Sequence, residues 1–207
     1  MTIGTKILAI TNVLAIIGAF VIAIFKIQLS EFFLKPKFDL SIEKHKTKGQ
    51  LNDGNLVDMY YWRIWIENKG KSKAKNVQIQ VSSLQEKGKA SDQLEKVNSF
   101  CAIDLLWSYS RKNYNNIILP NMGKHCDFFH VIKSHDNNKI IFDFEYITNI
   151  NGVCNAFYVG KAEYEIEIKI AAENVKPMIK KLKLNDSGNW FDEESKMYSD
   201  GISIEIL

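Results

Sequence analysis

The sequence predicts a mainly β protein in which an N-terminal transmembrane helix precedes an antiparallel β-sandwich, with a β-barrel as the alternative. An uncharged apolar run occupies residues 7–25, and apolar side chains then alternate with polar ones from residue 38 onward. No stretch after residue 38 keeps a helical period. The 207 residues, 46% hydrophobic and 25% charged, suit one globular domain plus an anchor.

The apolar run from Ile7 to Phe25, which includes Leu14 and Gly18, is predicted to cross a membrane. At about 1.5 Å per residue a helix of this length spans roughly 28 Å, close to the thickness of the hydrocarbon layer. A cleavable signal peptide would have a shorter apolar stretch and a small-x-small cleavage site, and neither is present. We therefore expect residues 1–29 to form an uncleaved anchor.

Small residues recur along this helix at a spacing of four. They are Ala15, Ala19 and Ala23, and Asn12 lies one turn before them. Small side chains let two membrane helices approach closely, and an amide can hydrogen-bond across the contact. The pattern favours self-association into a homo-oligomer, although alanine and glycine are common in any membrane helix.

Residues 30–37 form a basic and aromatic linker, in which Lys35 and Lys37 join Lys26 as candidates for contact with lipid headgroups. Residues 1–50 hold seven lysines and three acids, a net charge of +4, whereas the whole chain carries +3. Positive charge beside an anchor favours a cytoplasmic location for the domain that follows. The three cysteines are expected to be unpaired, as suits a reducing compartment.

Period-two alternation predicts the strands of the domain at residues 38–207. The strictest case is 164–170, and residues 59–67 place Tyr60, Trp62, Ile64 and Ile66 on one face. Residues 85–97 are charged and contain Gly88, so a loop with one helical turn is expected there. Asn151-Gly152 is a candidate tight turn. Further strands are predicted at 38–42, 77–81, 140–146, 182–184 and 202–206.

The segment WRIWIENKGKSKAKNVQIQV (62–81) carries the strand ending Asn68-x-Gly70, then Ala74, Asn76 and Val77. It resembles the second and third strands of bacterial immunoglobulin-like modules of the CARDB type. The chain also resembles uncharacterised prokaryotic single-pass membrane proteins. That likeness extends to residues 106–108, 118–120, 127–129, 164–177 and 188–190. The resemblance implies an immunoglobulin-like sandwich, and it implies no enzymatic activity.

One segment has letters typical of a metal site, because residues 123–135 contain His125, Cys126, His130 and His135. On a regular strand Cys126 and His130 share a face about 13 Å apart, and His125 lies on the other face. These positions do not suit four donors around one ion or a Cys/His nucleophile. Phosphate-binding and hydrolase motifs are absent from the sequence. We expect no metal, no cofactor and no catalytic residue.

Tyr61, Arg63 and Trp65 fall on the strand face opposite the predicted core. They form a candidate partner surface, unless a loop covers them or the strand is buried on both sides. Nucleic acid is not expected as a partner, because the chain has only two arginines. The sequence thus favours a non-enzymatic binding or scaffolding module that meets another protein at the membrane. The alternative is a ligand-sensing membrane effector of the anti-phage type, in which the β-domain controls clustering of the helix.

Overall fold

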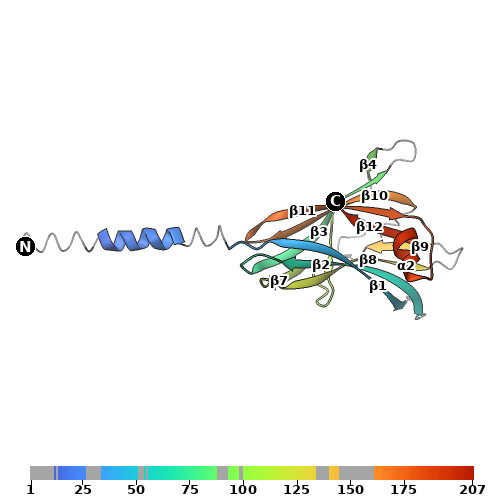
Figure 1. The fold of residues 1–207 in the computed structure, drawn as a ribbon, viewed down its shortest axis with the longest axis horizontal. Helices are drawn as coiled ribbons and strands as arrows, with labels where there is room; N and C mark the ends of the chain where they lie inside the picture. The colour runs from blue at the N-terminus through green and yellow to red at the C-terminus, as the bar shows by residue number, and fades with distance from the viewer. Residues whose placement is uncertain are drawn as a thin grey trace, which may run out of the picture.

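The structure is a computed structural model that describes residues 12, 14–26, 34–50, 54, 56–87, 93–97, 100–133, 140–144 and 161–207. Within these residues two antiparallel sheets form the body of the protein, and a helix over residues 14–26 lies apart from them beyond the start of β1 (Figure 1). The mainly β, antiparallel architecture predicted from period-two alternation is therefore confirmed.

The first sheet has the strand order β1-β2-β8-β6, and β9 pairs with the free part of β8. Its centre is a long ladder in which Ile42 of β1 faces Ile64 of β2, and Ile64 faces Cys126 of β8. Gly54 takes a positive φ of 86° in the β1–β2 connection, a conformation that glycine adopts without strain. The strands are β1 (Phe38–Gln50), β2 (Leu56–Asn68), β6 (Leu106–Trp107), β8 (Gly123–Lys133) and β9 (Ile140–Phe144).

The second sheet has the order β12-β11-β10-β3-β4, and two shorter strands, β5 and β7, also pair with β3. A three-residue helix and a π-helical turn lie between β11 and β12. The elements are β3 (Ala74–Lys87), β4 (Leu94–Lys96), β5 (Ile103–Asp104), β7 (Tyr114–Ile118), β10 (Ala162–Ala172), β11 (Val175–Asp186), α2 (Glu194–Lys196), η1 (Met197–Gly201) and β12 (Ile202–Ile206).

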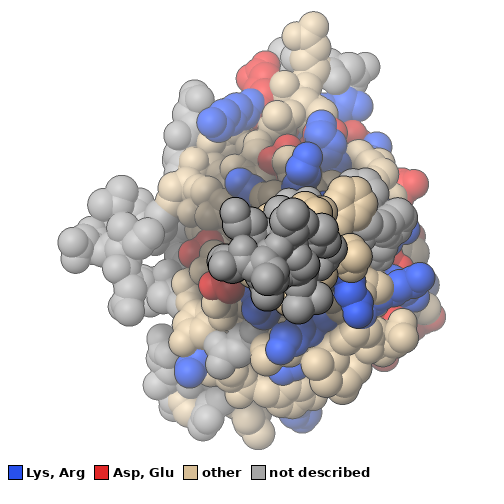
Figure 2. Space-filling view, turned by 90° about the vertical axis from the view of Figure 1, so that its left-hand side faces the viewer, with Lys and Arg blue, Asp and Glu red and all other residues tan. Residues whose placement is uncertain are grey.

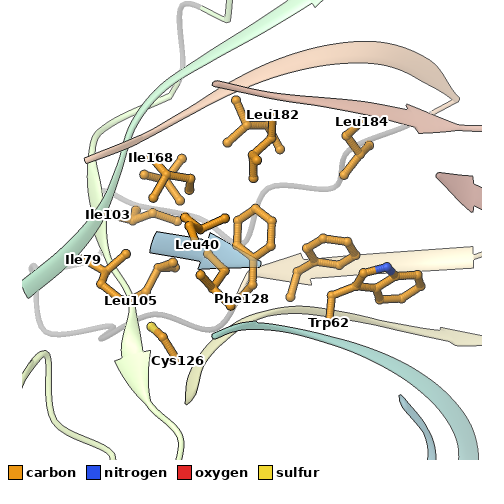
Figure 3. Packing of buried hydrophobic residues seen from close by; sticks show 14 of the residues in the cluster. Leu40, Trp62, Ile79, Ile103, Leu105, Cys126, Phe128, Ile168, Leu182 and Leu184 are labelled. Atoms are coloured by element: carbon orange, nitrogen blue, oxygen red, sulfur yellow. The ribbon is translucent and has the colours of Figure 1, made fainter. Parts of the chain in front are cut away.

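The core lies between the two sheets, where alternate side chains of both layers meet (Figure 3). Trp62 of β2 stacks on Phe129 of β8 with ring centroids 4.6 Å apart, and both side chains are fully buried. Ile79 of β3 and Ile168 of β10 enter the same core from the opposite sheet. The sheets stay separate layers throughout the described residues, which decides for a sandwich over the barrel alternative.

The prediction of a loop with one helical turn at residues 85–97 is wrong for residues 85–87 and 94–96, which are strands, whereas residues 88–92 lie outside the described residues. β3 continues to Lys87, and Gln85 pairs with Lys96 of β4 on one side and with Glu165 of β10 on the other. The neighbouring strands on both sides of β3 supply hydrogen-bond partners for its backbone N–H and C=O groups. This pairing outweighs the helical preference of the local sequence. The Asn151-Gly152 turn lies outside the described residues.

The cysteines correct another expectation. Cys101 is disulfide-bonded, whereas Cys126 is a buried free thiol. Cys154 lies outside the described residues. The expectation of unpaired cysteines is therefore wrong for Cys101, so cysteine usage no longer supports a reducing compartment. The expectation of a cytoplasmic domain then depends on the distribution of lysines alone.

Asp186 of β11 gives the domain a dependence on pH. Its Oδ1 accepts a hydrogen bond from the Gly188 N–H at 2.7 Å, while Oδ2 is buried with no partner among the described residues. Burial raises the pKa of Asp186 to about 6, although the Gly188 hydrogen bond opposes that rise. The folded state thus holds this proton more tightly than the unfolded state, so the stabilisation present at low pH is lost as pH rises through about 6.

We expect the free energy of unfolding to fall by about 1 kcal/mol between pH 5 and pH 8 because of this group alone. Asp186→Asn should abolish that part of the fall. Thermal unfolding of both chains at the two pH values measures it. Equal pH profiles for the two chains would contradict the assignment.

Candidate functional site

The outer face of the first sheet carries the residues that the sequence singled out as a partner surface. Tyr61, Arg63 and Trp65 alternate with the buried residues of β2 and point away from the core, as predicted. Tyr61 is nevertheless buried, and Arg63 and Trp65 are half-buried. Neighbouring side chains therefore pack over this face and convert it from a flat surface into a structured site.

A β-bulge in β8 supplies part of that packing. Trp62 faces Phe129 and Arg63 faces Asp127, so Phe128 is an extra residue in the ladder. Phe128 and Phe129 both enter the core. The alternation then restarts out of phase, and His130 stacks on Tyr61 of the outer face with near-parallel rings 6.2 Å apart. The prediction that His130 shares a face with Cys126 is therefore wrong.

Asp127 is the centre of a charge network on this face. Its side chain is only 3% exposed and pairs with two guanidinium groups, Arg63 Nε at 3.2 Å and Arg111 Nη1 at 2.9 Å. The Ser108 hydroxyl donates to the same carboxylate. Arg111 takes a left-handed conformation, with φ of 53°, that non-glycine residues rarely adopt. These bonds hold the loop between β6 and β7 down on the sheet.

Trp65 and His125 form the aromatic part of the site. Their ring centroids lie 4.6 Å apart, and His125 Nε2 lies 2.8 Å from Glu43 Oε2 of β1. Gly123 makes room for the indole, because a Cβ at that position would lie 2.3 Å from the Trp65 ring. Glycine is thus required here for a close approach, and Trp65 can lie flat across β8.

A pocket of about 210 Å³ opens beside these rings. It is smaller than the cavities that hold drug-sized ligands, so it suits one side chain or one ring-sized group. Tyr109, on the loop between β6 and β7, borders the pocket and is 88% exposed. The lining residues are Trp65, Trp107, Tyr109, Ser110, Asn115, Gly123, Lys124 and His125.

The candidate metal residues are not brought together. Cys126 points into the core, where its thiol donates to the Leu106 carbonyl and burial raises its pKa well above the ordinary value. His125 and His130 lie on the outer face in separate ring stacks, and His135 lies outside the described residues. Across the described ranges, three or more potential ligands nowhere gather into a metal-binding group.

The predicted anchor is described only in part. Residues 14–26 are helical, whereas Ile7 lies outside the described residues. The apolar side chains of the described helix are exposed, with Phe20 at 69% and Ile22 at 68%. Asn12 and the alanines at 15, 19 and 23 are exposed as well, as are Leu14, Gly18, Phe25 and Lys26. No helix among the described residues is long and apolar enough to cross a membrane.

Sequence reasoning identified one strand of the site and missed the rest. His130 reaches this face through a bulge, and Arg111 and Tyr109 reach it through a loop, neither of which period-two alternation describes. The adjacent buried pair Phe128-Phe129, which breaks the alternation, is the signal that could have revealed the bulge. Comparison with protein-family models, with curated proteins and with solved structures finds no match to this chain.

Proposed function

We propose that this protein is a membrane-anchored, non-enzymatic binding module that recognises a partner protein through the outer face of the β1-β2-β8-β6 sheet. The observation that carries the proposal is the pocket beside Trp65, whose indole is held by Gly123 and His125 and bordered by the exposed Tyr109. Tryptophan, tyrosine and arginine are the residues most enriched at energetically important interface positions.

The charges around the pocket favour an acidic partner. Lys124 lines the pocket and is exposed, and Arg111 and Lys112 are exposed on the adjoining loop. The acids of this face already have cationic or histidine neighbours, since Asp127 pairs with two arginines and Glu43 contacts His125. An acidic segment with one aromatic or aliphatic side chain to fill the pocket is the best complement.

The exposed apolar helix supports membrane attachment. Its side chains from Leu14 to Phe25 have no covering partner within the described residues, and an uncovered apolar surface of this kind is costly in water. We place the domain on the cytoplasmic side, because Lys26, Lys35 and Lys37 closely follow the apolar run in the sequence. The disulfide of Cys101 opposes this placement and provides a test of it.

Photo-crosslinking in the native host tests the recognition face. A photoreactive phenylalanine analogue at Tyr109 in the full chain should give one defined adduct, with its crosslinked peptide in an acidic segment. Trp65→Ala should weaken that adduct at least about tenfold, because a buried aromatic anchor contributes about 2 kcal/mol or more. The control places the analogue at Ile179, which is 55% exposed on β11 of the other sheet. The same adduct from both positions, or one unaffected by Trp65→Ala, would refute the proposal.

A further inference from the structure

The end of the sandwich nearest the helix carries lysines from two separate segments. Lys35 and Lys37 lie just before β1, and the β2–β3 connection with the start of β3 reads Lys69-Gly-Lys-Ser-Lys-Ala-Lys75, with four lysines and no acid. All six side chains are exposed. Figure 2 looks onto this end and shows blue side chains gathered around it, with fewer red ones. We name these six residues the basal lysines.

Backbone hydrogen bonds fix the two segments against each other. Lys69 N–H donates to the Lys37 carbonyl at 2.7 Å, and Lys37 N–H donates to Asn68 Oδ1 at 3.2 Å. A Cβ at Gly70 would lie 2.3 Å from the Lys35 carbonyl oxygen, so only glycine allows the loop to pass this close to the linker. The lysines therefore stand on a base that is ordered before anything binds.

The β10–β11 hairpin supports the loop from its other side. Lys75 N–H donates to Asn174 Oδ1 at 3.1 Å, and Asn174 Nδ2 donates to the Lys73 carbonyl at 2.9 Å. These bonds use backbone atoms of the lysines and leave their side chains unconstrained. A pocket of about 580 Å³ opens between the segments, lined by Leu34, Lys35, Pro36, Ser72, Lys73, Lys75, Glu173 and Asn174.

The charge of this end is mostly uncompensated. Lys69 pairs with Glu67 at 3.1 Å and approaches Asp39 at 3.9 Å. Among the described residues Lys37, Lys71, Lys73 and Lys75 form no ion pair, and Glu173 is the one acid in the pocket lining. Glu173 accepts a hydrogen bond from Asn76. An anion entering the pocket would therefore meet an excess of positive charge.

The length of the connection places these charges near the anchor. Leu34 in the pocket wall lies eight positions after Lys26, the last described residue of the helix. A fully extended chain of that length reaches at most about 29 Å. The basal lysines thus lie within reach of the surface of a bilayer that holds the helix.

We infer that the basal lysines form a binding site for the anionic headgroups of the membrane in which the protein is anchored, with one phosphate held in the pocket by Lys35, Lys73 and Lys75. This inference rests on the proposed membrane attachment. It extends the predicted headgroup contact of Lys26, Lys35 and Lys37 to a loop that is distant in sequence. The site would hold the sandwich upright on this end, so that the recognition face stands perpendicular to the plane of the membrane.

Amine labelling of the full chain in lipid nanodiscs tests the inference. Discs of phosphatidylcholine alone are compared with discs that also contain phosphatidylglycerol, and labelling at each lysine is followed by mass spectrometry. Labelling of Lys71, Lys73 and Lys75 should slow about fivefold in the anionic discs, since each lysine near such a surface gains about 1 kcal/mol. Lys48, exposed near the other end of β1, is the internal control and should not change.

A matched pair of variants and a soluble anion complete the experiment. The chain with Lys71→Glu, Lys73→Glu and Lys75→Glu should lose the lipid-dependent protection of Lys37, whereas Lys48→Glu should keep it. Equal labelling in both kinds of disc would overturn the inference. Protection by inorganic phosphate alone, in uncharged discs, would also overturn it by assigning the site to a free anion. A chain that does not enter discs at all would instead contradict the proposed membrane attachment.

Discussion

Replacing Asn68 by alanine is expected to lower the free energy of unfolding by about 3–5 kcal/mol, more than any other single polar substitution proposed here. Asn68 is fully buried at the end of β2. Its Oδ1 accepts from the backbone N–H groups of Lys37 and Gly70, and its Nδ2 donates to the carbonyls of Ser72 and Ile118. Alanine would leave four backbone groups without this partner in a site that water reaches poorly.

Chemical unfolding of the full chain in detergent, followed by tryptophan fluorescence, measures this loss. Asn185→Ala is the matched control, because Asn185 is exposed and makes one side-chain hydrogen bond, to Ser203 at 3.3 Å. Asn68→Asp should cost at least as much as Asn68→Ala, since it replaces the donor with a buried carboxylate oxygen that faces the carbonyls of Ser72 and Ile118. Equal midpoints for Asn68→Ala and Asn185→Ala would show that the residue does not hold this end of the sandwich together.

Two aspartates in the N-terminal helix are expected to release the protein from the membrane. Each carboxylate near the centre of a spanning helix costs about 2.5–3.5 kcal/mol, so Ile17→Asp with Val21→Asp should cost roughly 5–7 kcal/mol. The double variant should move from the membrane fraction to the soluble fraction of lysed cells. Ile17→Leu with Val21→Leu should stay with the membrane.

A third chain, Ile179→Asp, controls for an added carboxylate on an exposed apolar site of the sandwich, and it should also remain with the membrane. Release of this control would mean that any added charge detaches the protein. Retention of the double-aspartate chain would mean that the helix is not the anchor.

The same cells show on which side of the membrane the domain lies. On the cytoplasmic side, Cys101 should be reduced, so it should react with a permeant alkylating reagent added to intact cells. The reagent is quenched before the chain is unfolded for analysis. On the opposite side, the disulfide seen in the structure should persist and block that reaction until a reductant is added. Cys126 is buried and serves as an internal reference once the chain is denatured.

The alternation of apolar and polar residues was enough to predict much of the fold from the sequence. It placed the buried faces of β2, β3 and β10 correctly, because buried residues such as Ile79 and Ile168 have polar neighbours on both sides, and Arg63 and Glu67 mark the outer face of β2. It could not predict strand order, since period two says which face is buried and not which strand is adjacent. The extension of β3 to Lys87 was missed for the same reason, because its partners on β4 and β10 create the strand.

The candidate site was predictable only where it lies on a regular strand. Tyr61, Arg63 and Trp65 follow from alternation alone. His130 depends on the bulge at Phe128, and Arg111 depends on a left-handed conformation in a loop. Asn68 and Gly70 were assigned to a strand exit, but their contacts with Lys37 and Lys35 join segments that lie far apart in the sequence.

Membrane attachment through the N-terminal helix is the central claim, and extraction of native membranes tests it most directly. Membranes from cells that make the unaltered full chain are washed with alkaline carbonate and then floated through a density gradient. An inserted helix keeps the protein in the floating membrane layer, whereas a peripheral protein is washed away. Recovery of the protein with the floated membranes is the predicted result, and its appearance in the carbonate supernatant would contradict the account.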